Sequence, residues 1–154
     1  MIICNTHREK SFYLILEAVI PVFIGGLIYI LFRTDSLLMY RWFEQVNLSG
    51  YVYALRESIN LVNAGHFKTL INTLPGGLWA FSYTAFMLFI WSYEINSRNI
   101  FYFIFIPAVA ILSEYLQFIG TVSGTFDILD VFSYAAGAFL PLIIHFSKIK
   151  INFL

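Results

Sequence analysis

Residues 100–119 read IFYFIFIPAVAILSEYLQFI, twenty residues in which Glu114 is the single charged side chain. A helix needs about 20 mainly apolar residues to cross the hydrocarbon core of a membrane, and this stretch has that length and character. Irregular backbone cannot face lipid, so each such block predicts one membrane-spanning helix. Three further apolar blocks occur at about 11–32, 76–93 and 128–146. We therefore expect an all-α, polytopic membrane protein in which residues 1–154 form one domain with four transmembrane helices.

The composition favours a membrane location. Of the 154 residues, 60% are hydrophobic and 12% are charged, and the mean hydropathy is +0.78. A soluble domain is about 25% charged, so a soluble globular domain and a disordered chain are both excluded. Nine basic and nine acidic side chains give a formal net charge of zero, so we expect no nucleic-acid partner. The lone cysteine, Cys4, forms neither an internal disulfide nor a metal cluster, and we expect no metal and no other cofactor.

The distribution of basic residues predicts the orientation. Four spans put both termini on one side of the membrane, together with the short turn between the second and third spans. That side has five Lys and Arg residues and the first loop has four; they are Arg8, Lys10, Arg98, Lys148 and Lys150 against Arg33, Arg41, Arg56 and Lys68. The positive-inside rule then places both termini in the cytoplasm. The first block resembles a secretory signal, but its length and the missing small-residue cleavage site favour an uncleaved helix.

The first loop, about residues 33–75, is the largest part predicted to lie outside the membrane. Two stretches of it repeat apolar side chains at helical spacing: Val52, Leu55, Ile59 and Val62, then Phe67, Leu70, Ile71 and Leu74. They predict two short amphipathic helices at the membrane surface. Tyr40, Trp42 and Phe43 are typical of the aromatic belt at a membrane interface. The helices have two interpretations, an interfacial connector or a lid or docking surface.

Polar side chains inside the apolar blocks are the candidates for a functional site, because each is costly in a membrane unless it is paired or hydrated. The four candidates are Glu114 and Gln117 on one face of the third span, and Asp127 and Asp130 at the start of the fourth. The short turn between these spans is expected to bring the acids together near one membrane face. Capping is a second interpretation, in which Thr125 or Asp127 is the N-cap of the fourth helix. Close carboxylates repel, so protonation, a bound cation, Arg98 or an arginine of the first loop must compensate them.

Other residues of the spans are interpreted as structural. Gly137 and Ala138 allow a neighbouring helix to approach closely, and Trp79 lies in a stripe that predicts helix packing. Glu17 is expected to extend toward the head groups. His145, near the end of the fourth span, is expected at the membrane interface.

The residues around the candidate acids resemble a known family. Glu114-Tyr115-Leu116-Gln117, then Gly124-Thr125-Phe126-Asp127-Ile128-Leu129-Asp130 and Gly137, resemble the VanZ-like family of small bacterial membrane proteins. Leu74-Pro75-Gly76-Gly77-Leu78-Trp79 adds a weaker similarity. This chain has Thr125 where family members often carry arginine, and Tyr134 where they carry asparagine. The resemblance implies a four-span protein of the bacterial inner membrane with a role in the cell envelope, and the founding member is linked to low-level resistance to the antibiotic teicoplanin.

These observations together predict a function. We expect a non-enzymatic VanZ-like protein, without catalytic residues, that binds lipid or glycolipid head groups or supports a partner, with a role in antibiotic tolerance. Membrane lipids are the expected partners, and a homo-oligomer or another membrane protein are the candidate assemblies. Two alternatives stay open. One is an oligomeric channel or membrane-perturbing subunit, and the other is an intramembrane enzyme that uses Glu114, Asp127 or Asp130 as acid, base or metal ligand.

Overall fold

A computed structural model of the chain describes residues 3–33, 38–60 and 68–153. The described chain is mostly helical. Its helices are α1 (Ile3–Phe32), α2 (Leu38–Gln45), α3 (Ser49–Asn60), α4 (Lys68–Ile90), α5 (Ile100–Phe118) and α6 (Ile128–Ile144). A short 3-10 helix and two strands complete it: η1 (Phe146–Lys148), β1 (Glu94–Asn96) and β2 (Lys150–Asn152). The two strands pair in parallel, with Ile95 opposite Ile151.

Three helices in the described part of the chain are long and apolar enough to cross a membrane: α1 over Ile15–Phe32, α4 over Thr69–Ile90 and α5 over Ile100–Phe118. α6 is apolar as well but has only 17 residues. Much of the apolar surface of α5 is exposed, including the side chains of Phe101, Ile104 and Phe118. Apolar surface of this extent suits a lipid environment. The fold thus agrees with the predicted class, a mostly helical chain with helices suited to a membrane.

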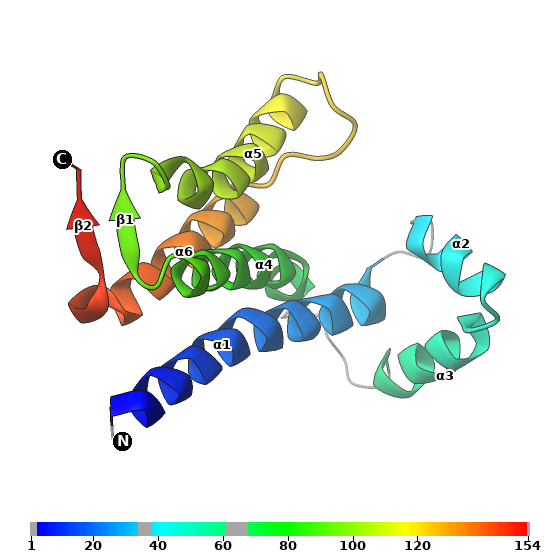
Figure 1. Cartoon of the computed structure of the whole chain (residues 1–154). Helices are drawn as coiled ribbons and strands as arrows, with labels where there is room; N and C mark the ends of the chain where they lie inside the picture. The colour runs from blue at the N-terminus through cyan, green and yellow to red at the C-terminus, as the bar shows by residue number, and fades with distance from the viewer. Residues whose placement is uncertain (1–2, 34–37, 61–67, 154) are drawn as a thin grey trace.

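Helix α4 is the centre of the bundle. It packs along α1 on one side and α6 on the other, whereas α5 contacts mainly α6. In Figure 1 the start of α1 lies toward the same end of the bundle as β1 and β2, and α2 and α3 extend from the opposite end. We call these the strand end and the arm end.

One predicted element is part of a longer helix. Leu70, Ile71 and Leu74 belong to the first turns of α4, which continues through Pro75, and they do not form a separate amphipathic helix. Proline removes one backbone donor from this turn. The carbonyls of the next two residues after Ile71 also accept side-chain donors, that of Asn72 from Arg33 and that of Thr73 from Ser133. Phe67 and Val62, which completed the two predicted patterns, lie outside the described residues.

Two features of the fold were not predicted. The aromatic residues Tyr40, Trp42 and Phe43 form a helix, α2, which precedes α3. The strands β1 and β2 have three residues each and so are too short to produce an alternating pattern in the sequence. α3 corresponds to the first predicted amphipathic helix and contains Val52, Leu55 and Ile59.

The contact between α4 and α6 is unusually close. Gly77 of α4 and Gly137 of α6 lie against each other, and a Cβ added at Gly137 would overlap the carbonyl oxygen of Gly77. A Cβ added at Gly77 would overlap Ser133, and one at Gly76 would overlap the ring of Tyr134. Only glycine at these positions lets the two backbones approach this closely.

We predict that Gly137→Ala destabilises the bundle by about 1–3 kcal/mol, because its methyl group must displace the α4 backbone. Gly26→Ala is the matched control, since a Cβ at Gly26 meets no atom within 4 Å and alanine favours a helix over glycine. Thermal unfolding in detergent, followed by circular dichroism at 222 nm, measures both variants. An unfolding temperature of Gly137→Ala equal to or above that of Gly26→Ala would contradict the close contact.

Candidate functional site

The hairpin formed by α5 and α6 carries the candidate acids. Glu114 of α5 is buried, with 5% of its surface exposed. Its Oε2 accepts a hydrogen bond from the backbone N–H of Asp127 at 3.3 Å. The start of α6 is therefore tied to α5 through a buried carboxylate, at the arm end of the bundle.

Gln117 lies one turn further along α5, beside the loop that joins the two helices. In this loop Gly124 has a φ of 148°, a conformation that favours glycine. A Cβ at Gly124 would also overlap the amide oxygen of Gln117. Gln117 thus packs against the loop backbone.

Asp127 caps α6. Its backbone is extended, with φ −131° and ψ 117°, and its Oδ1 accepts a hydrogen bond from the N–H of Leu129 at 2.9 Å. A helix start leaves backbone N–H groups without partners, and an aspartate here satisfies one of them. This geometry confirms the interpretation of Asp127 as the N-cap of the helix.

Asp130 lies one turn into α6 and faces α4. Its carboxylate lies near Thr73 and within electrostatic range of Asp127 and Arg33, but the buried Thr73 hydroxyl has no hydrogen-bond partner among the described residues. Arg33 directly follows α1, so the first loop supplies the positive charge nearest to the acids. Arg98, the other basic residue considered, precedes α5 at the strand end.

The guanidinium of Arg33 is held by α1 and α4. Its Nη2 donates to the carbonyl oxygen of Asn72 at 3.1 Å, and its carbon lies 5.3 Å from the ring centre of Tyr29. Its Nε is buried and has no hydrogen-bond acceptor among the described residues. Arg33 therefore keeps an unused donor close to the candidate acids.

Tyr134 completes this group, because it lies within electrostatic range of Glu114, Asp130 and Arg33. We define the polar cluster as Arg33, Thr73, Glu114, Asp127, Asp130 and Tyr134. The cluster combines three carboxyl groups with one guanidinium, so it offers more hydrogen-bond acceptors than charged donors. Within the described ranges no three His, Cys, Asp or Glu side chains are grouped so that they could hold a metal ion.

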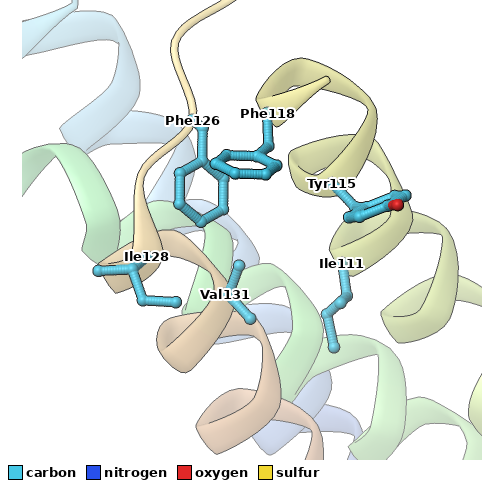
Figure 2. A pocket seen from close by; sticks show the side chains of 6 residues that line it. All are labelled: Ile111, Tyr115, Phe118, Phe126, Ile128 and Val131. Atoms are coloured by element: carbon cyan, nitrogen blue, oxygen red, sulfur yellow. The ribbon is translucent and has the colours of Figure 1, made fainter. Parts of the chain in front are cut away.

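An apolar hollow lies on the same α5–α6 hairpin, lined by none of the residues of the polar cluster. Figure 2 shows its lining, Ile111, Tyr115 and Phe118 from α5 and Phe126, Ile128 and Val131 from the loop and α6. The hollow has a volume of about 290 Å³. The rings of Phe118 and Phe126 meet edge to face, with centres 5.3 Å apart. Tyr115, Phe126 and Ile128 are chain neighbours of Glu114 and Asp127, so the hollow and the acids lie on the same stretch of the hairpin.

A second polar contact, at the strand end, was not predicted. His145 is buried, with 5% exposed, and its Nε2 lies 2.6 Å from Oε2 of Glu17. The expectations of an interfacial His145 and of a Glu17 that extends to the head groups are thus replaced by a pair between α6 and α1. Glu17 interrupts the first apolar block and His145 lies near the end of the fourth. A polar residue at such a place is costly unless it is paired, and this was the signal in the sequence that could have indicated the contact.

The surroundings of His145 define its tautomer. Lys148 Nζ lies 3.4 Å from Nδ1 of His145, and an ammonium group can only donate. Nδ1 therefore accepts, and the Nε2–H of His145 donates to Glu17. Tyr93 packs edge-on against His145 at 5.4 Å between ring centres, and burial, followed by the negative charge of Glu17, raises the pKa of the Tyr93 phenol.

The three residues interpreted as packing residues all lie between helices. Trp79 of α4 packs against Gly25, where an added Cβ would come within 2.8 Å of Nε1, and against the ring of Tyr29 at 5.5 Å. Gly137 touches the α4 backbone, as described above. Ala138 is buried and lines a cavity between α4, α5 and α6.

No protein-family model, curated protein or solved structure matches the chain. The resemblance to the VanZ-like family therefore rests on the motif residues alone. The function must be argued from the polar cluster, the hollow beside it and the helices that hold them.

We predict that Asp127→Asn leaves the stability nearly unchanged, because asparagine caps a helix about as well as aspartate. Asp127→Ala removes the acceptor for Leu129 N–H and is expected to cost about 1 kcal/mol. Thermal unfolding in detergent compares the two variants. If Asp127→Asn is as destabilising as Asp127→Ala, the carboxylate charge matters more than the cap.

We also predict that Glu17 and His145 are energetically coupled. Glu17→Gln and His145→Gln, made singly and together, form a double-mutant cycle. The expected coupling is on the order of 1 kcal/mol, since a hydrogen bond to a charged group is lost in either single variant. The free energy of unfolding in mixed detergent micelles measures each corner of the cycle. Strict additivity of the two single effects would refute the pairing.

Proposed function

We propose that this chain is a non-enzymatic, four-span integral membrane protein of the bacterial inner membrane, and that its polar cluster binds the head group of a lipid or glycolipid. The observations that carry the proposal are the buried carboxylate of Glu114, with the half-buried Asp130 and Arg33 in the same cluster, and an apolar hollow on the same helix hairpin. A molecule with a polar head and an apolar chain needs both surfaces next to each other. The resemblance to the VanZ-like family extends the proposal to a role in the cell envelope and in antibiotic tolerance.

The four-span layout follows from treating α6 as the last span. Its 17 residues give a length of about 26 Å, slightly less than the hydrocarbon thickness of about 30 Å. Local thinning of the bilayer accommodates such a difference at modest cost. Both termini then lie on one side, and the small excess of basic residues there supports a cytoplasmic location.

Helices α2 and α3 form an interfacial arm in this proposal. They expose apolar side chains, including Leu38, Trp42 and Tyr51. Two side chains fix the arm to the end of α1: Tyr40 Oη donates to the carbonyl oxygen of Ile30 at 2.6 Å, and Arg56 Nη1 donates to the same oxygen at 3.1 Å. The arm would then lie along the outer membrane surface, next to the polar cluster.

The charges of the polar cluster define the head group it would accept. Three carboxylates require donors, which an ammonium group or the hydroxyls of a sugar supply. The free Nε of Arg33 requires an acceptor, such as a phosphate or a glycosidic oxygen. Phosphatidylethanolamine and glycosyl diacylglycerols carry both kinds of group. Phosphatidic acid carries the phosphate without the ammonium or sugar.

We predict that the protein in mild detergent binds phosphatidylethanolamine or a glucosyl diacylglycerol at least tenfold more tightly than phosphatidic acid, as measured by native mass spectrometry. Glu114→Gln and Asp130→Asn should each lower the affinity for the preferred lipid by about tenfold, because each removes a charge-assisted hydrogen bond. Glu94→Gln is the matched control, since Glu94 is an exposed acid of β1 at the strand end.

Two results would contradict the proposal. One is equal binding of all three lipids by the wild type. The other is an unchanged preference in the double variant Glu114→Gln, Asp130→Asn while the variant keeps its wild-type helical spectrum. In that case the cluster would only stabilise the hairpin.

A further inference from the structure

We infer that a second ligand site lies at the strand end, in the cavity between α4, α5 and α6, and that it takes an apolar molecule carrying one hydroxyl or carbonyl oxygen. The cavity has a volume of about 390 Å³, within the range of about 300–1,000 Å³ that is usual for small-molecule sites. Its lining includes Thr84, Ile95, Ile100, Phe103, Ala108 and Ala138. The site shares no residue with the polar cluster and only Ile111 with the hollow on the α5–α6 hairpin, and its hydrogen-bonding group, Thr84, plays no part in the head-group proposal.

The hydroxyl of Thr84 is the observation that points to a ligand. Thr84 is 1% exposed, and its Oγ1 has no hydrogen-bond partner among the described residues. Buried polar groups are nearly always paired, because water can no longer satisfy them. Thr84 is also the one polar side chain among the described residues that line the cavity. The cavity therefore offers a single hydrogen bond inside an otherwise apolar surface.

Neither water nor a charged molecule suits this cavity. An ordered water needs two to four polar partners, and the lining side chains offer one. An ionised head group would lack a counter-charge among the lining residues and would bear the full cost of burial. A saturated hydrocarbon chain fills the space but leaves Thr84 unpaired. An apolar molecule with one oxygen fills the cavity and also forms a hydrogen bond with the hydroxyl of Thr84.

The position of the cavity fits a ligand that is dissolved in the bilayer. α5 forms one wall, contacts mainly α6, and leaves much of its outer apolar surface exposed. Ile95 and Ile100 flank the turn between β1 and α5, so the cavity reaches the strand end of the bundle. A long-chain alcohol or a prenol can enter along such a helix without crossing water.

The test compares 1-decanol with n-decane, which differ by one hydroxyl group. Protein in phospholipid nanodiscs is titrated with each compound, and the methyl NMR signals of Ile95 and Ile100 report on occupancy. We expect 1-decanol to bind about fivefold more tightly than n-decane, the difference that one net hydrogen bond supplies. Thr84→Val keeps the shape of the side chain and should abolish this preference, whereas Thr84→Ser keeps the hydroxyl and should retain it.

Two further variants test the place of binding, including the case in which Thr84→Val does not fold. Ala108→Leu fills the cavity from α5 and should lower the affinity for both 1-decanol and n-decane at least fivefold. Val109→Leu is its control, because Val109 is exposed on the same helix and does not line the cavity. Equal binding of the two compounds by the wild type would overturn the inference, as would unchanged 1-decanol binding by Ala108→Leu. These results are independent of the lipid preference of the polar cluster.

Discussion

The close contact between Gly77 and Gly137 is the constraint on which the rest of the structure depends. It lets the backbones of α4 and α6 touch, so that side chains on either side of the contact meet across a short gap. Asp130 lies seven residues before Gly137, two helical turns along the same face, and this places it on the side of α6 that packs against α4. In the other direction the same helix carries His145 to Glu17. One seam of small residues therefore positions the polar groups at both ends of the bundle.

The polar cluster and the pair of Glu17 with His145 lie at the two ends of the bundle, and the last turns of α4 bury apolar residues such as Ala85 and Leu88. A membrane protein gains little from apolar contacts between its helices, because lipid is equally apolar. Backbone proximity and a few buried polar contacts then have more influence on which helices pair. The bond from Asp127 N–H to Glu114 links the consecutive helices α5 and α6, and the pair of His145 with Glu17 links helices that are distant in sequence.

The sequence predicted the long helices well, because twenty apolar residues in a row have few alternatives in a membrane. It also predicted the cap by Asp127, which depends only on neighbouring residues. It did not predict the partner of Glu17, since a pairing across 128 positions leaves no local pattern. Arg33 was one of several basic residues considered for the acids, and only the packing of α1 on α4 places it beside Asp130. The start of α4 was misassigned, because residues 68–75 were given to the first loop whereas α4 begins at Lys68. Two carbonyls near this start accept side-chain donors from Arg33 and from Ser133 of α6.

The dependence of α5 on α6 has a consequence for the order in which the protein is assembled. Chains emerge from the ribosome with the N-terminal part first, so α1 and α4 can pair before the rest of the chain is made. α5 is synthesised next, but its main contacts are with α6, which emerges last. During this interval Glu114 has neither the Asp127 backbone nor α6 beside it, and an unpaired acid within an apolar helix is costly in lipid. α5 and α6 are therefore expected to enter the bilayer as a hairpin, with the turn between them already formed.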